Sequence, residues 1–121
     1  MKPLLIIDDD YDLRASIADV LHNEGYRVEL FGDARQALSA LRNGLKPSLI
    51  LLDLMMPEMN GWEFRAEQRK DPELNAIPVL VVTARTSGDL SRETLGEVEI
   101  LRKPFTVLEL RHAIERRVKA A

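Results

Sequence analysis

The sequence lacks cysteine, an apolar run long enough to cross a membrane, and an excess of basic residues. Without cysteine, neither disulfides nor thiolate chemistry can contribute. The first apolar run reaches three aspartates within a few residues, which is too short for a signal peptide or a membrane span. The net charge of −3 argues against direct nucleic-acid binding. We therefore expect a cytoplasmic protein that neither inserts into membranes nor contacts nucleic acid directly.

Glycine-rich nucleotide-binding loops are also missing. No G-x-G-x-x-G follows the first apolar run and no G-x-x-x-x-G-K is present, so dinucleotide and P-loop sites are excluded. There are no repeats, no low-complexity segment and no linker. A chain of 121 residues without such breaks is long enough for one domain, and we assign residues 1–121 to it.

Short apolar runs alternate with helical patterns along the chain. The runs at residues 4–7, 49–52 and 78–83 have no polar interruption, which is typical of parallel strands covered on both faces. Shorter segments at 27–31 and 98–101 complete a set of strands with amphipathic helices between them. The pattern predicts an α/β fold of the flavodoxin-like type: a five-stranded parallel sheet in the order 2-1-3-4-5, with helices on both faces.

Two of the predicted helices have weak apolar faces. In the helix that follows the third strand, Arg65 and Gln68 occupy positions where packing residues would recur. We therefore expect this helix to be thinly packed. Residues 85–96 offer only Leu90 and Leu95 as large apolar side chains, so they predict a weak helix at best.

Acidic side chains follow two of the buried runs. Asp8 and Asp9 come directly after the first run, and Asp53 follows the run at 49–52, just before a turn that contains proline and Asn-Gly. In the predicted strand order the first and third strands flank the switch point, where open parallel sheets bind ligands. The three carboxylates are therefore expected in one crevice.

Carboxylates so close together repel one another unless a cation joins them. Oxygen ligands without histidine or cysteine favour Mg²⁺ or Mn²⁺. Thr83 brings a hydroxyl to the end of the fourth strand and Lys103 brings an ammonium after the fifth, so both could contact the oxygens of a phosphoryl group. Asp53, at the centre, would then be the nucleophile that becomes an acyl phosphate.

With these positions in place, the chain closely resembles the receiver domain of two-component response regulators over essentially its whole length. The resemblance rests on four motifs in combination: Ile-Ile-Asp8-Asp9-Asp10, Leu-Leu-Asp53-Leu-Met-Met-Pro57 with Asn60-Gly61, Val-Val-Thr83-Ala84, and Lys103-Pro104-Phe105. It implies that Asp53 accepts phosphate from a sensor histidine kinase or a histidine phosphotransfer domain. Because the family's Lys-Pro bond is usually cis, it also implies a cis bond between Lys103 and Pro104.

The resemblance further implies a set of ligands. Mg²⁺ would be bound by Asp9, Asp53 and the backbone carbonyl of Met55, with Asp8 acting through water. Lys103 and Thr83 would contact the phosphoryl oxygens.

These features lead to a functional hypothesis. We interpret the chain as a phospho-accepting switch that catalyses its own phosphorylation and dephosphorylation, passes the signal to an unknown downstream protein, and does not turn over an external metabolite. A phosphorylation-independent docking module of the same fold is the alternative. A metal-dependent phosphatase is a third hypothesis, but it lacks a second acid two residues after the nucleophile, where Met55 stands.

Two features depart from the receiver pattern. Receivers often carry an aromatic residue three positions before the lysine, and here that position is Ile100. The stretch from Thr83 to Lys103 is slightly shorter than usual, at the expense of the fourth helix. We therefore expect the signal to leave the site mainly through residues 84–96 and not through position 100.

Overall fold

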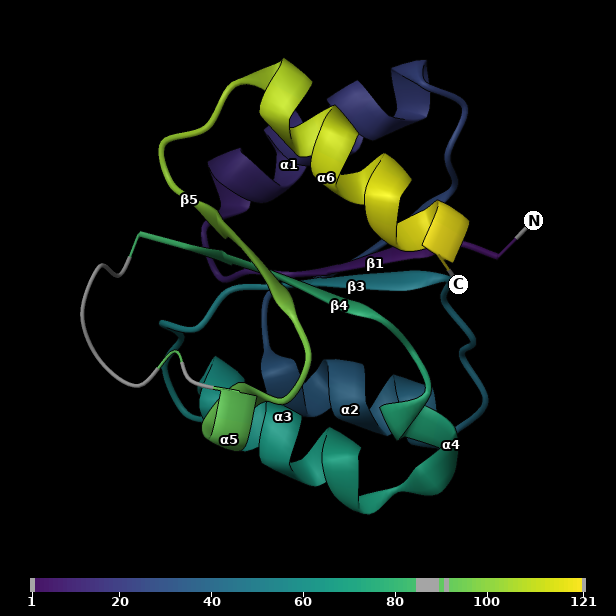
Figure 1. Cartoon of the computed structure of the whole chain (residues 1–121), viewed down its shortest axis with the longest axis vertical. Coiled ribbons are helices and arrows are strands. Elements are labelled where there is room, and N and C mark those ends of the chain that lie inside the picture. Colours follow the sequence, from purple (N-terminus) through teal and green to yellow (C-terminus); the bar gives the residue numbers. More distant parts are fainter. Residues whose placement is uncertain (1, 85–89, 91, 121) are drawn as a thin grey trace.

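The computed structural model describes residues 2–84, 90 and 92–120. Each strand is followed by a helix along these residues, with α3 and α4 both lying between β3 and β4, and the sheet lies between two layers of helices (Figure 1). None of these helices combines the length and apolar character that a membrane crossing requires. The elements are β1 (Leu4–Ile7), α1 (Tyr11–Asn23), β2 (Val28–Phe31), α2 (Ala34–Arg42), β3 (Leu49–Leu52), α3 (Gly61–Lys70), α4 (Pro72–Asn75), β4 (Val79–Thr83), α5 (Arg92–Leu95), β5 (Glu99–Arg102) and α6 (Val107–Ala120).

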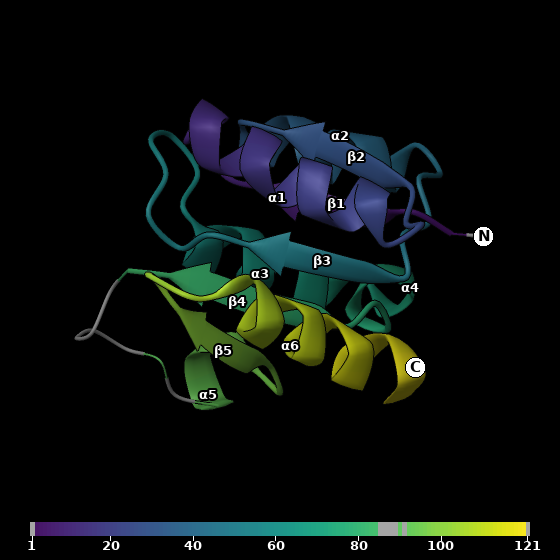
Figure 2. The same cartoon turned by 90° about the horizontal axis from the view of Figure 1, so that it is seen from above.

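The sheet has five parallel strands in the order β2-β1-β3-β4-β5. Figure 2 shows from above how β3, β4 and β5 follow one another. The predicted α/β fold and its strand order are therefore confirmed. Every residue of β1, β3 and β4 is buried, whereas β2 and β5 form the edges and are only partly covered. The uninterrupted apolar runs predicted this difference, because only a central strand must be apolar on both faces.

The sheet separates two apolar cores. Leu4 and Ile6 face the core beneath α1 and α6, and Leu5 and Ile7 face the core beneath α2, α3, α4 and α5. Successive residues of a strand point to opposite faces, so both cores draw on the same short strands. Each fully buried aliphatic side chain stabilises the fold by about 1.5–3 kcal/mol.

Short polar side chains cap several helices at their N-termini. Asp10 and Asp33 accept hydrogen bonds from backbone N–H groups of α1 and α2, and Thr106 does so for α6. Asn60 and Glu63 form a reciprocal capping box at the start of α3. These caps fix where the loops that follow β1, β2 and β3 turn into helices.

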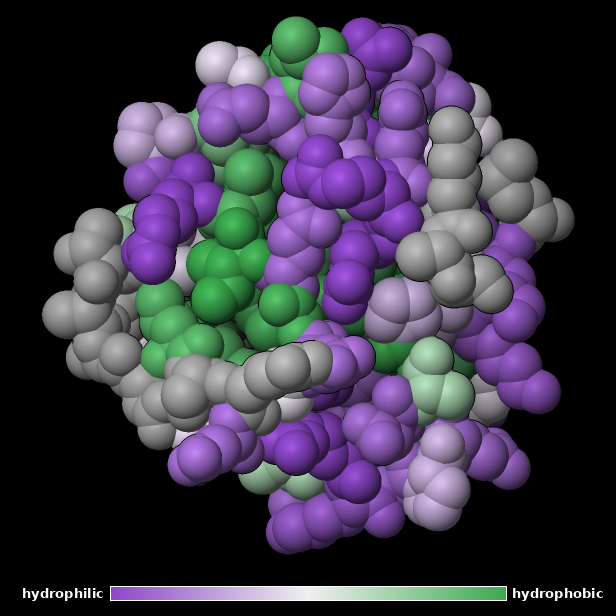
Figure 3. Space-filling view, viewed as in Figure 1, coloured by the Kyte–Doolittle hydropathy of each residue, from purple (hydrophilic) through white to green (hydrophobic). Residues whose placement is uncertain are grey.

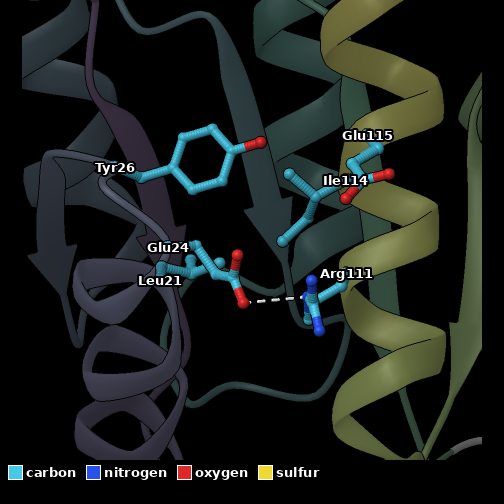
Figure 4. A pocket seen from close by; sticks show the side chains of 6 residues that line it. All are labelled: Leu21, Glu24, Tyr26, Arg111, Ile114 and Glu115. Carbon is cyan, nitrogen blue, oxygen red and sulfur yellow. Dashed lines mark ion pairs between the residues drawn. The ribbon is translucent and has the colours of Figure 1, made fainter.

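An ion pair joins the two helices on the α1 face of the sheet. Arg111 Nε of α6 lies 2.9 Å from Glu24 Oε1 at the end of α1 (Figure 4). The pair borders a cavity of about 310 Å³ that Leu21, Tyr26 and Ile114 also line. Because both charged side chains are more than a third exposed, the pair contributes little to stability.

The expectation that α3 is thinly packed is wrong. Arg65 and Gln68 are 4% and 0% exposed. Arg65 Nε donates to the Leu95 carbonyl at 2.7 Å, and its Nη1 donates to Gln68 Oε1 at 2.6 Å. Gln68 Nε2 in turn donates to the carbonyls of Leu74 and Ile77, at 2.8 and 3.2 Å. Polar side chains can be buried at low cost when their donors find partners, and here they join α3 to α4 and α5.

The weak helix expected within residues 85–96 is present as the single turn α5, while residues 85–89 and 91 of that segment lie outside the described residues. Leu95 is fully buried. Arg69 Nη1 donates to the carbonyls of Glu93 and Thr94, each at 3.2 Å. Cationic groups are favourable at a helix C-terminus, so arginines of α3 anchor α5 together with this leucine.

Replacing Gln68 with leucine tests the polar network. The variant keeps a similar side-chain volume but leaves a charged donor of Arg65 and the carbonyl of Ile77 without this partner. We expect the free energy of unfolding to fall by about 2 kcal/mol in urea denaturation. Gln36→Leu, on the exposed face of α2, is the control and should change stability by less than about 0.5 kcal/mol. Equal effects would show that Gln68 behaves as a surface residue.

Candidate functional site

The carboxylates of Asp8, Asp9 and Asp53 meet at the carboxyl edge of the sheet. Each offers an oxygen, and these oxygens lie within 4.8 Å of one another. Asp8 follows β1 and Asp53 follows the adjacent β3, and the Asp53 N–H donates to the Ile7 carbonyl at 3.0 Å. Asp8 and Asp53 are only 3% and 5% exposed, whereas Asp9 faces solvent. The structure thus brings together the three acids that the sequence placed at strand ends.

Lys103 reaches the same crevice from the end of β5. Its Nζ lies 3.0 Å from Asp8 Oδ2 and 3.7 Å from Asp53 Oδ2. The lysine side chain is 19% exposed, so its charge is partly withdrawn from water and bridges the two buried acids. The peptide bond to Pro104 is cis, as the resemblance implied.

Thr83 is the last residue of β4 and is fully buried. The pairing of Leu52 with Val81 places Thr83 level with the loop just after Asp53. Its carbonyl accepts a hydrogen bond from the Lys103 N–H at 2.9 Å. Thr83 therefore lies between the strand end that carries the central acid and the strand end that carries the lysine.

The loop after β3 bends back onto the Asp53 carboxylate. The backbone N–H of Met55 donates to Asp53 Oδ1 at 3.3 Å, and Met55 as a whole is 51% exposed. The backbone of Met55 thus lies beside the crevice. That its carbonyl binds a metal stays a prediction.

Gly61 is required by the close approach of α3 to this loop. A Cβ at position 61 would lie 2.6 Å from the Asp53 carbonyl oxygen and 2.7 Å from Leu54 Cα, which is closer than such atoms can pack. The Gly61 N–H donates to the Leu54 carbonyl at 3.0 Å. The sequence indicated a turn at Asn60-Gly61, but the contact with the backbone of Asp53 gives this glycine a second role that no local pattern reveals.

The electrostatics of the crevice favour a cation. Burial, and then the nearby Asp8 carboxylate, raise the pKa of Asp53 from 3.8 to about 6, although Lys103 and the Met55 N–H partly oppose this. The lysine therefore offsets only part of the repulsion among the acids. A divalent cation would relieve the remainder, and the oxygen-only donor set fits Mg²⁺ or Mn²⁺.

Known proteins match the chain along almost its whole length. Residues 4–115 match the response regulator receiver domain. The chain belongs to this family. It is a receiver domain of the response regulator type, in which an acidic crevice at the carboxyl edge of a parallel sheet is the expected site of signalling chemistry.

Three relatives illustrate the match. The DNA-binding response regulator MtrA of Mycobacterium tuberculosis is 36% identical over 119 residues, which cover 96% of this chain and 50% of MtrA. The chemotaxis protein CheY4 of Vibrio cholerae superposes with a TM-score of 0.85 at 30% identity, covering 96% of this chain and 98% of CheY4. The response regulator TrrA of Thermotoga maritima, in complex with Mg²⁺-BeF, superposes with a TM-score of 0.83 at 28% identity, covering 97% and 99%. The receiver domain spans about half the length of the curated relatives it matches.

Asp53→Asn should stabilise the metal-free receiver domain near neutral pH. Because the pKa of Asp53 is higher in the fold than in the unfolded chain, the folded protein loses stability as the pH rises from about 4 to about 6. In chelator at pH 7.5 we expect the variant to be more stable by about 1–3 kcal/mol, because each unit of pKa shift corresponds to about 1.4 kcal/mol. The difference should close below about pH 4.

Urea denaturation at both pH values measures this difference. Asp19→Asn removes an exposed carboxylate of α1 and serves as the control, with no comparable pH-dependent gain. An Asp53→Asn variant that is no more stable than the wild type at pH 7.5 would contradict the claim that ionisation of Asp53 destabilises the metal-free fold.

Proposed function

We propose that Asp53 accepts a phosphoryl group from a phosphohistidine of a sensor histidine kinase or a histidine phosphotransfer domain, and that this switches the domain's interactions with a downstream protein. The observation that carries the proposal is the position of Lys103 Nζ, within 4.0 Å of both Asp8 and Asp53 in one crevice. Membership of the receiver family supports the same chemistry.

In the transfer, a carboxylate oxygen of Asp53 attacks phosphorus, the bond from phosphorus to the histidine nitrogen breaks, and the imidazole leaves with a proton taken from solvent. With a pKa near 6, Asp53 is mainly ionised at neutral pH and can act as the nucleophile. The ammonium of Lys103 is placed to balance negative charge on the phosphoryl oxygens. Thr83, at the neighbouring strand end, is proposed to donate its hydroxyl to the same oxygens.

The residues at the crevice fit a resident divalent cation. Asp9, Asp53 and the backbone carbonyl of Met55 would hold Mg²⁺ or Mn²⁺ directly, and Asp8 would act through water. When bound, the cation supplies charge neutralisation to the acids and to the phosphoryl oxygens. The support is the clustering of the three carboxylates and the raised pKa of Asp53, together with the Mg²⁺-BeF complex of the related TrrA.

The proposal also covers the extent of the domain, its cellular location and the partners that it does not contact. Residues 1–121 are taken as one receiver domain that works in the cytoplasm as a switch, without turnover on an external metabolite. MtrA is named as DNA-binding, but the match covers only half of it, so the absence of direct nucleic-acid contact stays a prediction for this chain. The docking-only alternative is not favoured, because the acids, the threonine and the lysine are all present, and the acids and the lysine meet in one crevice.

Incubation with acetyl phosphate and Mg²⁺ should add one phosphoryl group to the chain, measured by intact mass. Asp53→Asn should abolish the gain because it removes the nucleophile, and a chelator should suppress it because the acids then lack their cation. Asp71→Asn, at the N-terminus of α4 and outside the crevice, is the matched control and should be phosphorylated normally. Full phosphorylation of Asp53→Asn would contradict the assignment.

The signal should leave the site mainly through residues 84–96, which include α5. Ile100 lies on the edge strand β5, where it pairs with Val81 and is half-buried. Figure 3 shows apolar surface in the region between α6 and α5. The β-branched side chain of Ile100 is stiff at the first torsion, so it cannot replace a rotating ring. We expect Mg²⁺ with beryllofluoride to shift the backbone NMR signals of residues 85–95 more than those of α6.

Ile100→Ala is the companion variant. It should change affinity for the downstream partner by less than about tenfold, or 1.4 kcal/mol, and leave phosphorylation intact. If the largest shifts centre on Ile100 and α6 instead, position 100 carries the signal despite lacking a ring.

A further inference from the structure

Arg14 of α1 holds the end of β1 beside the crevice. Its Nη1 donates to the backbone carbonyl oxygen of Asp8 at 2.7 Å. The Asp8 carboxylate accepts separate hydrogen bonds, from the Asp10 N–H at 2.9 Å and from Lys103 Nζ at 3.0 Å. Asp8 is therefore held at its backbone carbonyl by Arg14 and at its carboxylate by the N-cap residue of α1 and by Lys103.

The guanidinium takes the place of a strand partner. The Asp8 N–H donates to the Phe31 carbonyl at 3.1 Å, which is where β2 ends. Beyond Phe31 the chain turns toward α2 and offers no further strand residue on this side of β1. A backbone carbonyl this close to the core needs a donor, and Arg14 supplies it.

Gly32 leaves the space that the guanidinium fills. A Cβ at position 32 would lie 2.7 Å from Arg14 Nη1 and 3.4 Å from its Cζ. The ring of Tyr11 lies 5.4 Å from the same Cζ, within the range of a cation–π contact. Arg14 is thus confined by the first turn of α1 and by the turn between β2 and α2.

We infer that Arg14 is a positioning residue for the metal site: it holds the turn that carries Asp8 and Asp9 in the arrangement that a divalent cation requires. The inference rests on the proposed function and adds a residue to it. Asp8 and Asp9 share one short turn, whereas Asp53 comes from another strand, so the geometry of the cluster depends on how that turn is held. Removing a group that orients a metal ligand typically weakens metal binding by a factor of about 10 to 100.

The positive charge of Arg14 allows the direction of the change in Mg²⁺ affinity to separate two possible roles. If the guanidinium acted only as a positive charge near the acids, its removal would make the crevice more negative and would tighten cation binding. A positioning role predicts the opposite, because the ligands lose their alignment. The two roles are therefore separated by the direction of the change in affinity.

The experiment is an NMR titration of the full chain with MgCl₂ at constant ionic strength. Arg14→Gln should weaken Mg²⁺ binding about tenfold. Arg42→Gln removes the same charge from the exposed end of α2 and should change the dissociation constant by less than about twofold. Unchanged or tighter binding in Arg14→Gln would overturn the inference.

Gly32→Ala provides a second variant that keeps the positive charge. Its methyl group should displace the guanidinium from the Asp8 carbonyl and weaken Mg²⁺ binding by a similar factor. The double variant should bind no more weakly than Arg14→Gln alone, since both changes remove one contact. Wild-type affinity in a folded Gly32→Ala would overturn the inference, and this variant decides the matter if Arg14→Gln does not fold.

Asp9→Asn separates this inference from the proposed function. If Asp9→Asn binds Mg²⁺ as the wild type does, the proposed metal site is itself wrong. If Asp9→Asn loses Mg²⁺ binding while Arg14→Gln and Gly32→Ala retain wild-type affinity, the metal site stands and only the role of Arg14 is overturned.

Discussion

The repulsion among three carboxylates at one edge of the sheet is the constraint on which the rest of the structure depends. The parallel pairing of β1 with β3 sets Asp8 beside Asp53, and burial then raises the pKa of Asp53 to about 6. Lys103 offsets part of this cost from the end of β5. Such a site is best satisfied by a cation together with the oxygens of a phosphoryl group, which is the chemistry expected of a receiver domain.

Helix α3 packs against the loop that carries Asp53 and connects the crevice to α5. Gly61 lets α3 approach the backbone of Asp53 directly. Farther along α3, Arg65 donates to the Leu95 carbonyl at the end of α5. A continuous series of contacts therefore joins the crevice to α5 without involving Ile100, which suits a receiver domain that lacks an aromatic residue at that position.

Much of this could be predicted from the sequence, because uninterrupted apolar runs allow few arrangements. The runs that became β1, β3 and β4 specified a parallel sheet, and right-handed crossovers then specified its order and the edge where the acids meet. The burial of Arg65 and Gln68 could not be predicted, since it depends on backbone carbonyls of α4 and α5 that no helical period contains. The contact of Arg14 with the Asp8 carbonyl could not be predicted either, because it depends on the space that Gly32 leaves in a turn distant along the chain.

A crystal structure of the receiver domain with Mg²⁺ and beryllofluoride would test the central claim most directly. The account predicts beryllofluoride on a carboxylate oxygen of Asp53, with Lys103 Nζ and Thr83 Oγ1 within hydrogen-bonding distance of its fluorine atoms and the cation on Asp9, Asp53 and the Met55 carbonyl. Beryllofluoride on a different acid, or a lysine that stays between Asp8 and Asp53 without contacting the ligand, would contradict it.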